Sequence, residues 1–443
     1  MNQNNTEQII ENLHPSEIAS YLRKVNKEDE DTFFQILHNI DDDDLGEVLL
    51  ELPEGLRDKA YNSLSPEQIS HAIEELETDD ATDIIQDLEE LDEQKADDIL
   101  NSLDQEDRDD INWLKKYDED EAGAYMQIEL FKANIHQTVQ EAVDSLKKLK
   151  LEGELENIHQ LFIVDDDESL VASIPLEDLI IYDFSTSFEE IIKQNSELFK
   201  PIYVQGDSSI EEVVKLFGDY DLSVLAVVGY KKRLLGRITS DDIIDVVEHN
   251  ATEQIYQLAG VNDESEQEES FIEVGKTRAS WLLINLGTAI LASFVIGFFD
   301  DVLKQYIALA VLMPIVASMG GNAGTQTLTV MVRQLALGDI DDQNSRHAIK
   351  KEIFISILNG ILFAIILGVI ASFWFSNITL GIVIGFAMII TLFCAGLFGS
   401  VIPLILRKLD IDPAIGSTVI LTTVTDVMGF FSFLGLAKIF LIS

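Results

Sequence analysis

The sequence predicts a multidomain membrane protein with an all-α, superhelical amino-terminal domain, a duplicated α/β module, a connecting helix and a transmembrane domain of five helices. Two observations predict this class. The 443 residues have a formal charge of −49, although 47% of them are hydrophobic. The charge is also segregated, because residues 1–275 hold 70 acidic and 20 basic residues, whereas residues 276–443 hold 9 and 10. Such a polyanion lacks the basic residues that bind nucleic acid, so no nucleic-acid partner is expected.

Residues 1–129 are predicted to form an acidic helical domain, because apolar residues recur at spacings of three and four, as in Ile9, Ile10 and Leu13. The segment Asp43–Val48 resembles the segment Asp79–Ile84, which lies 36 residues later. A repeat of that length is typical of stacked helix pairs. The acidic runs are either a solvated surface or a surface that binds cations, since so large a negative charge repels itself.

Residues 130–242 are predicted to contain strands, because Leu161–Val164 and Val224–Val228 are short runs of apolar, mostly β-branched residues. Each run is followed by a turn, a second strand and an acidic helix start. Two strand–strand–helix units therefore form a duplicated α/β module. Residues 243–274 are predicted to connect this module to the membrane through a charged helix, which is either a spacer or a gate.

Five apolar stretches in residues 275–443 are predicted to cross the membrane, at 279–299, 306–332, 353–375, 378–406 and 413–437. Each exceeds the roughly 20 residues that a helix needs to span the hydrocarbon core. The positions of the basic residues place the amino-terminal domains in the cytoplasm and the carboxyl terminus outside. Met1–Glu11 lacks the apolar segment of a signal peptide, and the single cysteine, Cys394, agrees with a reducing compartment. The plasma membrane of a prokaryote is the expected location.

One charged residue, Asp426, lies inside the predicted spans. A charged side chain at mid-membrane costs about 2.5–3.5 kcal/mol on insertion scales. The carboxyl is therefore either protonated and bonded to a neighbouring helix, or part of a cation site on a water-filled path. Thr418, Thr422 and Thr425 are expected to surround it and to offer hydroxyl oxygens. Oxygen ligands suit hard cations such as Mg²⁺ or Ca²⁺.

The second predicted span contains Pro314 and the stretch Gly321-Asn322-Ala323-Gly324. Proline and repeated glycine are expected to break the helix and to free backbone carbonyls, which is tolerated where a helix lines a cavity. The alternative is close packing of helices, since Gly320 and Gly324 lie four residues apart and form a face of small residues.

Motifs and segment order together resemble one family, the MgtE magnesium channels and transporters. The most specific motif is Pro-x6-Gly-Asn-x-Gly-x-Gln, here Pro314 to Gln326, and the stretch Gly236–Asp242 resembles a CBS (Bateman) pair. The resemblance implies a homodimer in which the second and fifth spans of both subunits line one pore. It implies that hydrated Mg²⁺ is held there by Asp426, Thr422, Gly321, Asn322 and Gly324.

The same resemblance implies that cytosolic Mg²⁺ closes the pore at a sensor formed by Asp221, Asp242, Asp245, Glu248 and Glu253. CBS pairs in this family bind adenine nucleotides or sense ions, and the residues that match a nucleotide site are Asp178, Thr239 and Asp242. Glu177, Pro175 and Ala172 depart from the nucleotide-binding pattern, which puts ATP in question. His249-Asn250 departs from the more acidic pattern of the connecting helix.

The predicted function is thus a Mg²⁺-selective, Mg²⁺-gated channel for magnesium uptake. The alternatives are a coupled secondary transporter of Mg²⁺ or Co²⁺, and a membrane-tethered sensor of ions or nucleotides. An enzyme is not expected, because the sequence offers no nucleophile–base pair, no Walker A loop and no His-rich metal site.

Overall fold

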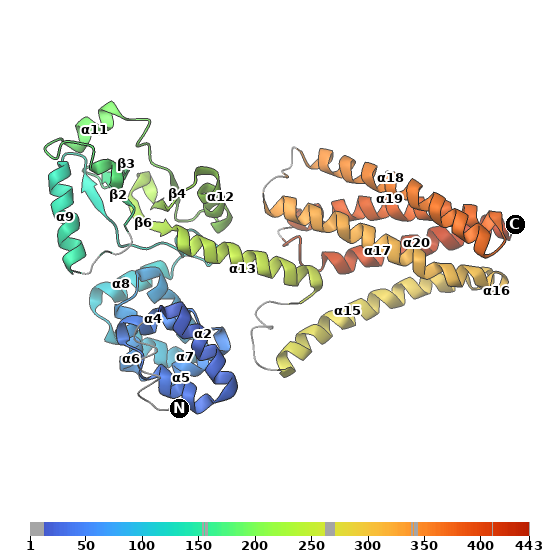
Figure 1. Ribbon diagram of the computed structural model, residues 1–443, viewed down its shortest axis with the longest axis horizontal. Coiled ribbons are helices and arrows are strands. Elements are labelled where there is room, and N and C mark those ends of the chain that lie inside the picture. Colours follow the sequence, from blue (N-terminus) through green and yellow to red (C-terminus); the bar gives the residue numbers. More distant parts are fainter. Residues whose placement is uncertain are drawn as a thin grey trace. The chain divides into compact units, whose positions relative to one another are not determined.

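The computed structural model describes residues 13–152, 155, 158–261, 271–337, 340, 344–409 and 411–442 (Figure 1). The chain divides into two units, Met1–His249 and Asn250–Ser443. The first unit holds helices and two small sheets, and the second holds only helices among its described residues.

The first unit begins with helices whose apolar faces share one core, in which Phe33, Leu45 and Tyr61 are fully buried. Ser65 accepts a hydrogen bond from the backbone of Gln68 and so caps one of these helices. This confirms the predicted all-α domain. The helices are α2 (Pro15–Glu28), α3 (Glu30–Leu37), α4 (Asp42–Leu50), α5 (Glu54–Ser63), α6 (Pro66–Glu74), α7 (Thr78–Ser102) and α8 (Gln105–Leu114).

Two three-stranded sheets follow, in the orders β1-β2-β3 and β4-β5-β6. In each sheet the first two strands run parallel and the last two antiparallel, with the same register irregularity before the end of the middle strand. The prediction of a duplicated module is confirmed, although the short strands β1 and β4 were missed. The strands are β1 (Lys132–Asn134), β2 (Gln160–Val164), β3 (Leu170–Pro175), β4 (Tyr203–Gln205), β5 (Val224–Val228) and β6 (Leu234–Thr239).

Helices connect and flank these strands, and the last of them continues past the end of the first unit. Each of the predicted acidic helix starts is present, at Leu176 and at Ser240. The helices are α9 (Val139–Glu152), α10 (Leu176–Leu179), α11 (Phe188–Gln194), α12 (Ile210–Tyr220), the 3-10 turn η1 (Tyr230–Lys232) and α13 (Ser240–Ala259).

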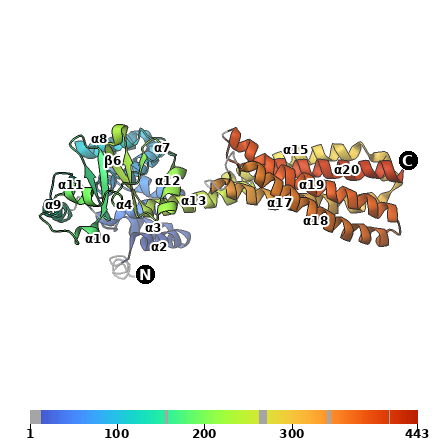
Figure 2. The ribbon, with the colours of Figure 1, turned by 90° about the horizontal axis from the view of Figure 1, so that it is seen from above.

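Among its described residues, the second unit contains five helices long and apolar enough to cross a membrane, which confirms the five predicted spans. Helix α19 packs against α17, α18 and α20, and α15 packs against α20 (Figure 2). The helices of this unit are α15 (Phe271–Gly297), the short α16 (Asp300–Gln305), α17 (Ile307–Ala336), α18 (Ser345–Trp374), α19 (Ile378–Lys408) and α20 (Ser417–Leu441).

The predicted break in the second span is wrong, because α17 continues without interruption through Pro314 and the Gly321–Gly324 stretch. Proline fixes φ near its helical value and removes one hydrogen bond, to the carbonyl of Ala310. In a membrane the other backbone groups keep their helical bonds, since no water replaces them. The backbone carbonyls of Gly321–Gly324 are thus not freed by an interruption.

Candidate ion pathway and acidic cluster

Helices α17 and α20 approach each other closely at glycines. A Cβ atom on Gly320 would lie 3.6 Å from Cβ of Thr425, and one on Gly324 would lie 3.1 Å from Cδ1 of Leu421. Residue numbers rise along α17 as they fall along α20, so the two helices are antiparallel. The close packing of small residues, considered above as the alternative to a cavity, is therefore present.

Asp426 and Thr422 lie beside this contact, one turn apart on α20, and both are half-buried. On α17, Gly321 follows the contact residue Gly320, and a Cβ atom on Gly321 would have no neighbour within 4 Å. In two antiparallel right-handed helices, the residues that follow a contacting pair point to the same side of the contact. Gly321, Thr422 and Asp426 therefore share one side, next to open space.

The Asp426 carboxylate has no hydrogen-bond or ion-pair partner among the residues that the structure describes. A protonated carboxyl bonded to a neighbouring helix, one of the two alternatives for this residue, is not observed. The oxygens of Asp426 are therefore free to face the open space, and carboxylate oxygens are ligands that hard cations accept.

The other predicted pore residues are placed differently. Gly324 is buried against Leu421. Asn322 is exposed on another face of α17, where its amide lies 3.5 Å from Oγ of Ser318. A single copy of the chain therefore does not bring Asn322 to Asp426.

The expectation that three threonines surround Asp426 is wrong for Thr425, which is fully buried against α17. Its hydroxyl donates to the backbone carbonyl of Thr422 at 3.1 Å. The reason is that successive helical residues point about 100° apart, so Thr425 and Asp426 cannot share a face. Thr418, Thr422 and Asp426 are spaced by four residues and therefore form a polar stripe along one face of α20.

Thr418 joins this stripe to the end of α13 within the second unit. Its hydroxyl donates to the backbone carbonyl of Leu258 at 2.8 Å. That carbonyl belongs to the last turn of α13, where carbonyls have no helical partner. The Leu258 side chain packs in a cluster that includes Leu328 of α17 and Leu421 of α20. The end of the connecting helix is thus fixed to α20, which carries Asp426, and to α17, which packs beside it.

The first unit contains an acidic cluster, which we define as Glu77, Asp79, Asp80 and Asp242. Burial raises the pKa of Asp80 to about 8 and that of Glu77 to about 7, and repulsion among the carboxylates adds to both shifts. Burial also raises the pKa of Asp79, which is 6% exposed and whose Oδ1 atom has no hydrogen-bond partner in the described chain. The guanidinium of Arg237 lies 3.0 Å from Glu77.

Asp242 closes the cluster from the start of α13. The hydroxyl of Thr239 donates to Oδ2 of Asp242 at 2.6 Å, and the amide of Gln127 lies 3.5 Å from the same oxygen. Burial raises the pKa of Asp242 despite the bond from Thr239, which lowers it. One carboxylate predicted for the sensor therefore lies in a buried acidic environment.

The other predicted sensor residues lie outside the cluster. Asp221, at the left-handed end of α12, is exposed, as are Asp245 and Glu248 on α13. Glu253 belongs to the second unit, where it accepts a hydrogen bond from Gln257. The sequence analysis missed Glu77, Asp79 and Asp80 as sensor candidates, although the Asp79–Ile84 repeat contains two of them.

A cleft of about 670 Å³ adjoins the acidic cluster at Glu77 and Asp80. Burial raises the pKa of Asp107 and of Asp110 in its wall. Its remaining acidic side chains are Glu47, Glu74, Glu75, Glu106 and Glu129. In the described parts of the chain, no three His, Cys, Asp or Glu side chains converge tightly enough to hold a bare metal ion.

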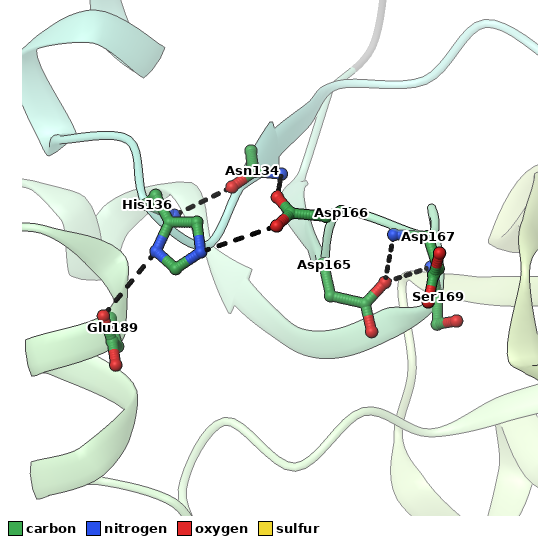
Figure 3. Close-up of polar contacts among 7 residues, drawn as sticks. All are labelled: Asn134, His136, Asp165, Asp166, Asp167, Ser169 and Glu189. Atoms are coloured by element: carbon green, nitrogen blue, oxygen red, sulfur yellow. Dashed lines mark hydrogen bonds and ion pairs between the residues drawn. The ribbon is translucent and has the colours of Figure 1, made fainter.

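Another group of polar side chains surrounds His136 on the surface of the first unit, and its geometry does not suit a metal ion (Figure 3). Its Nδ1 atom lies 3.6 Å from Glu189, and its Nε2 atom lies 3.9 Å from Asp166, so the two carboxylates contact different ring nitrogens. Asn134 also donates to Asp166, at 3.1 Å. These ligands do not meet at one point, and the network links a β2–β3 turn to α11.

The residues that match a nucleotide site are divided between the two α/β repeats. Asp178 is half-buried in α10 of the first repeat. Thr239 and Asp242 stand at the β6–α13 junction of the second repeat and are hydrogen-bonded to each other.

Five apolar helices joined to a strongly acidic unit define an integral membrane protein, and the Asp426 carboxylate, which has no partner among the described residues, suits a cation. Family models agree: residues 313–436 match a divalent cation transporter, residues 13–120 the MgtE intracellular N domain, and residues 196–249 a CBS domain. The chain is 34% identical to "Magnesium transporter MgtE" of Thermus thermophilus over 75% of this chain and 73% of that protein. It is 28% identical to the protein of that name from Bacillus subtilis, over 98% and 93%. The chain belongs to the MgtE family.

Two solved structures are also similar. One is the cytosolic domain of the Mg²⁺ channel MgtE in complex with ATP, with 30% identity, a TM-score of 0.49, and coverage of 54% of this chain and 93% of that one. The other is the soluble part of a magnesium transporter, with 26% identity, a TM-score of 0.39, and coverage of 54% and 100%. Because both TM-scores lie below 0.5, membership of the family rests on the sequence relatives.

Proposed function

We propose that this chain is a Mg²⁺-selective channel for magnesium uptake, which works as a homodimer and closes when cytosolic Mg²⁺ rises. The observation that carries the proposal is the Asp426 carboxylate, which is half-buried among membrane helices, has no partner in the part of the chain that the structure describes, and lies beside open space at Gly321. The protein would lie in the plasma membrane, with its amino-terminal domains in the cytoplasm and its carboxyl terminus outside.

A second copy of the chain is part of this proposal for a physical reason. One copy exposes polar side chains, Ser318 and Asn322, on α17. Polar side chains in membrane helices face other helices or water rather than lipid. A second copy would cover this face and supply a second Asp426. Two carboxylates would balance the charge of one Mg²⁺, which dehydrates reluctantly and would be bound with its water shell.

The acidic cluster supports the proposed gating. Burial and mutual repulsion raise the pKa values of its carboxyl groups, so ionising them is costly, and a bound divalent cation would offset that cost. The sensor in this proposal combines Asp242 of the cluster with the predicted residues Asp221, Asp245, Glu248 and Glu253. A cation shifts a gate only by its differential affinity for the closed state, and about 5.5 kcal/mol moves a gate from almost fully open to almost fully closed. Thr418 and Leu258 would transmit the change from α13 to α20.

ATP is a further proposed ligand, at Asp178, Thr239 and Asp242. Isothermal titration of the purified chain with ATP tests it. Heat that disappears in Thr239→Ala would support the site, and the absence of heat would remove the nucleotide from the proposal.

The coupled transporter remains the second candidate, because the second unit contains another buried carboxylate, Glu352. A coupled transporter would use an ionisable group of this kind for the driving ion. Mg²⁺ flux into proteoliposomes with and without a pH gradient distinguishes the two. Flux that follows the Mg²⁺ gradient alone and is lost in Asp426→Ala supports the channel, whereas flux that requires the pH gradient supports coupling.

A further inference from the structure

Glu352 is a carboxylate that the sequence analysis placed just outside the third span and did not assign to any site. The structure places it in the second turn of α18, where it is 8% exposed. A carboxylate buried at such a position is costly unless it is hydrogen-bonded. Its partners therefore decide what it does.

The partner is Thr327 of α17, whose hydroxyl donates to Oε2 of Glu352 at 3.2 Å. Thr327 is 5% exposed and lies three residues after Gly324, the last glycine of the Gly321–Gly324 stretch. Helices α17 and α18 contact each other over a short stretch, and each packs chiefly against α19. The hydrogen bond thus ties the helix that flanks Asp426 to a helix that does not.

The backbone of α19 comes close to α17 and to α18 beside this hydrogen bond. A Cβ atom on Gly396 of α19 would lie 3.2 Å from the Glu352 carbonyl oxygen, and one on Gly399 would lie 2.8 Å from the Gly324 carbonyl oxygen. Helix α19 therefore fits tightly against α18 at Glu352 and against α17 at Gly324. The bond between Thr327 and Glu352 adds a direct link between α17 and α18, beside the contacts that each of them makes with α19.

We infer that Glu352 is a positioning residue for ion selection: by holding Thr327 it fixes Gly321 relative to Asp426. The inference rests on the proposed pore. A 20° rotation of α17 would move its Cα atoms by about 0.8 Å, given a helix radius of about 2.3 Å. Hydrated Mg²⁺ keeps its waters in near-ideal octahedral geometry, whereas Ca²⁺ tolerates irregular geometry, so the groups that bind the waters of Mg²⁺ must be placed accurately. Loss of the bond therefore relaxes the discrimination between Mg²⁺ and Ca²⁺.

The test measures Mg²⁺ and Ca²⁺ flux side by side in proteoliposomes that contain the full chain. Thr327→Val removes the hydroxyl at constant shape, Glu352→Leu removes the acceptor, and Glu352→Gln retains an acceptor without the charge. We expect the first two to lower the Mg²⁺-to-Ca²⁺ flux ratio about fivefold, which corresponds to about 1 kcal/mol for a buried hydrogen bond. The double variant should resemble each single variant, because both remove the same bond. Glu352→Gln should stay within about twofold of the parent.

Thr288→Val is the matched control, because the Thr288 hydroxyl donates within its own helix to Asn285. A purely structural role for Glu352 would lower both fluxes together and leave the ratio unchanged, which would overturn the inference. Complete loss of transport in Glu352→Gln alone would also overturn it, in favour of a coupling role. If Glu352→Leu does not fold, Thr327→Val decides. Failure of the pore itself is seen separately, as full Mg²⁺ flux in Asp426→Asn.

Discussion

The hydrogen bond from Thr418 to the Leu258 carbonyl is the structural link through which α13 would act on the ion pathway. Thr418→Val removes the hydroxyl and keeps the shape of the side chain. In the proposed mechanism the pore closes when α13 is fixed to α20. We therefore predict that the variant, which loses one hydrogen bond of that arrangement, needs more cytosolic Mg²⁺ to close.

The size of the effect follows from the contact. A buried hydrogen bond contributes about 1 kcal/mol net, and an orphaned carbonyl costs about 1–3 kcal/mol if water cannot reach it. Leu258 is only half-buried, so water can reach its carbonyl in the variant, and the expected loss is about 1 kcal/mol. About 1 kcal/mol changes the open-to-closed ratio about fivefold at fixed Mg²⁺.

The assay is Mg²⁺ flux in proteoliposomes as a function of Mg²⁺ on the side of the soluble unit. Thr423→Val is the matched control, since its hydroxyl donates within α20 to Val419 at 2.7 Å. The expected result is an inhibition curve displaced to higher Mg²⁺ in Thr418→Val and unchanged in the control. A curve that coincides with the parent's would refute the proposed link between α13 and α20.

Two further predictions concern stability. The pKa of Asp80 is raised to about 8 and that of Glu77 to about 7 in the folded chain. The unfolded chain therefore loses these protons first, and the folded chain becomes less stable as pH rises from about 4 to about 8. Without divalent cations the melting temperature of the purified chain should fall across that range, and Mg²⁺ should restore it at pH 8. The melting temperature of Asp80→Asn should depend less on pH. If it depends on pH as strongly as that of the parent, Asp80 is not the group that causes the fall. The Thr391 hydroxyl is fully buried and has no partner among the described residues, so Thr391→Val should be neutral or stabilise by about 1 kcal/mol, and a lower melting temperature would contradict this.

Features that depend on composition were predictable. The five membrane helices follow from the length of the apolar stretches, and the repeated α/β module from two apolar runs with the same succession of elements. Asp426 could be singled out because the sequence alone shows a charged residue within an apolar stretch. Strands β1 and β4 were not predictable, since three residues carry too little pattern.

Features that depend on three-dimensional neighbours were not predictable. Pro314 favoured a broken helix, but the need for backbone hydrogen bonds in the membrane outweighed it. Glu352 stood at the edge of an apolar stretch, and only the contact with Thr327 marks it as a buried group. The acidic cluster joins Asp79 and Asp80 to Asp242, residues far apart in the sequence, so no local pattern could assemble it.

The central proposal is that Mg²⁺ passes at Asp426 and that cytosolic Mg²⁺ stops it. The most direct measurement is Mg²⁺ flux into proteoliposomes containing the full chain or Asp426→Ala, with and without millimolar Mg²⁺ on the side of the soluble unit. We predict passive flux in the parent that is lost in the variant and suppressed by Mg²⁺ on that side. Undiminished flux through folded Asp426→Ala would contradict the pore, and flux indifferent to Mg²⁺ on that side would contradict the gate.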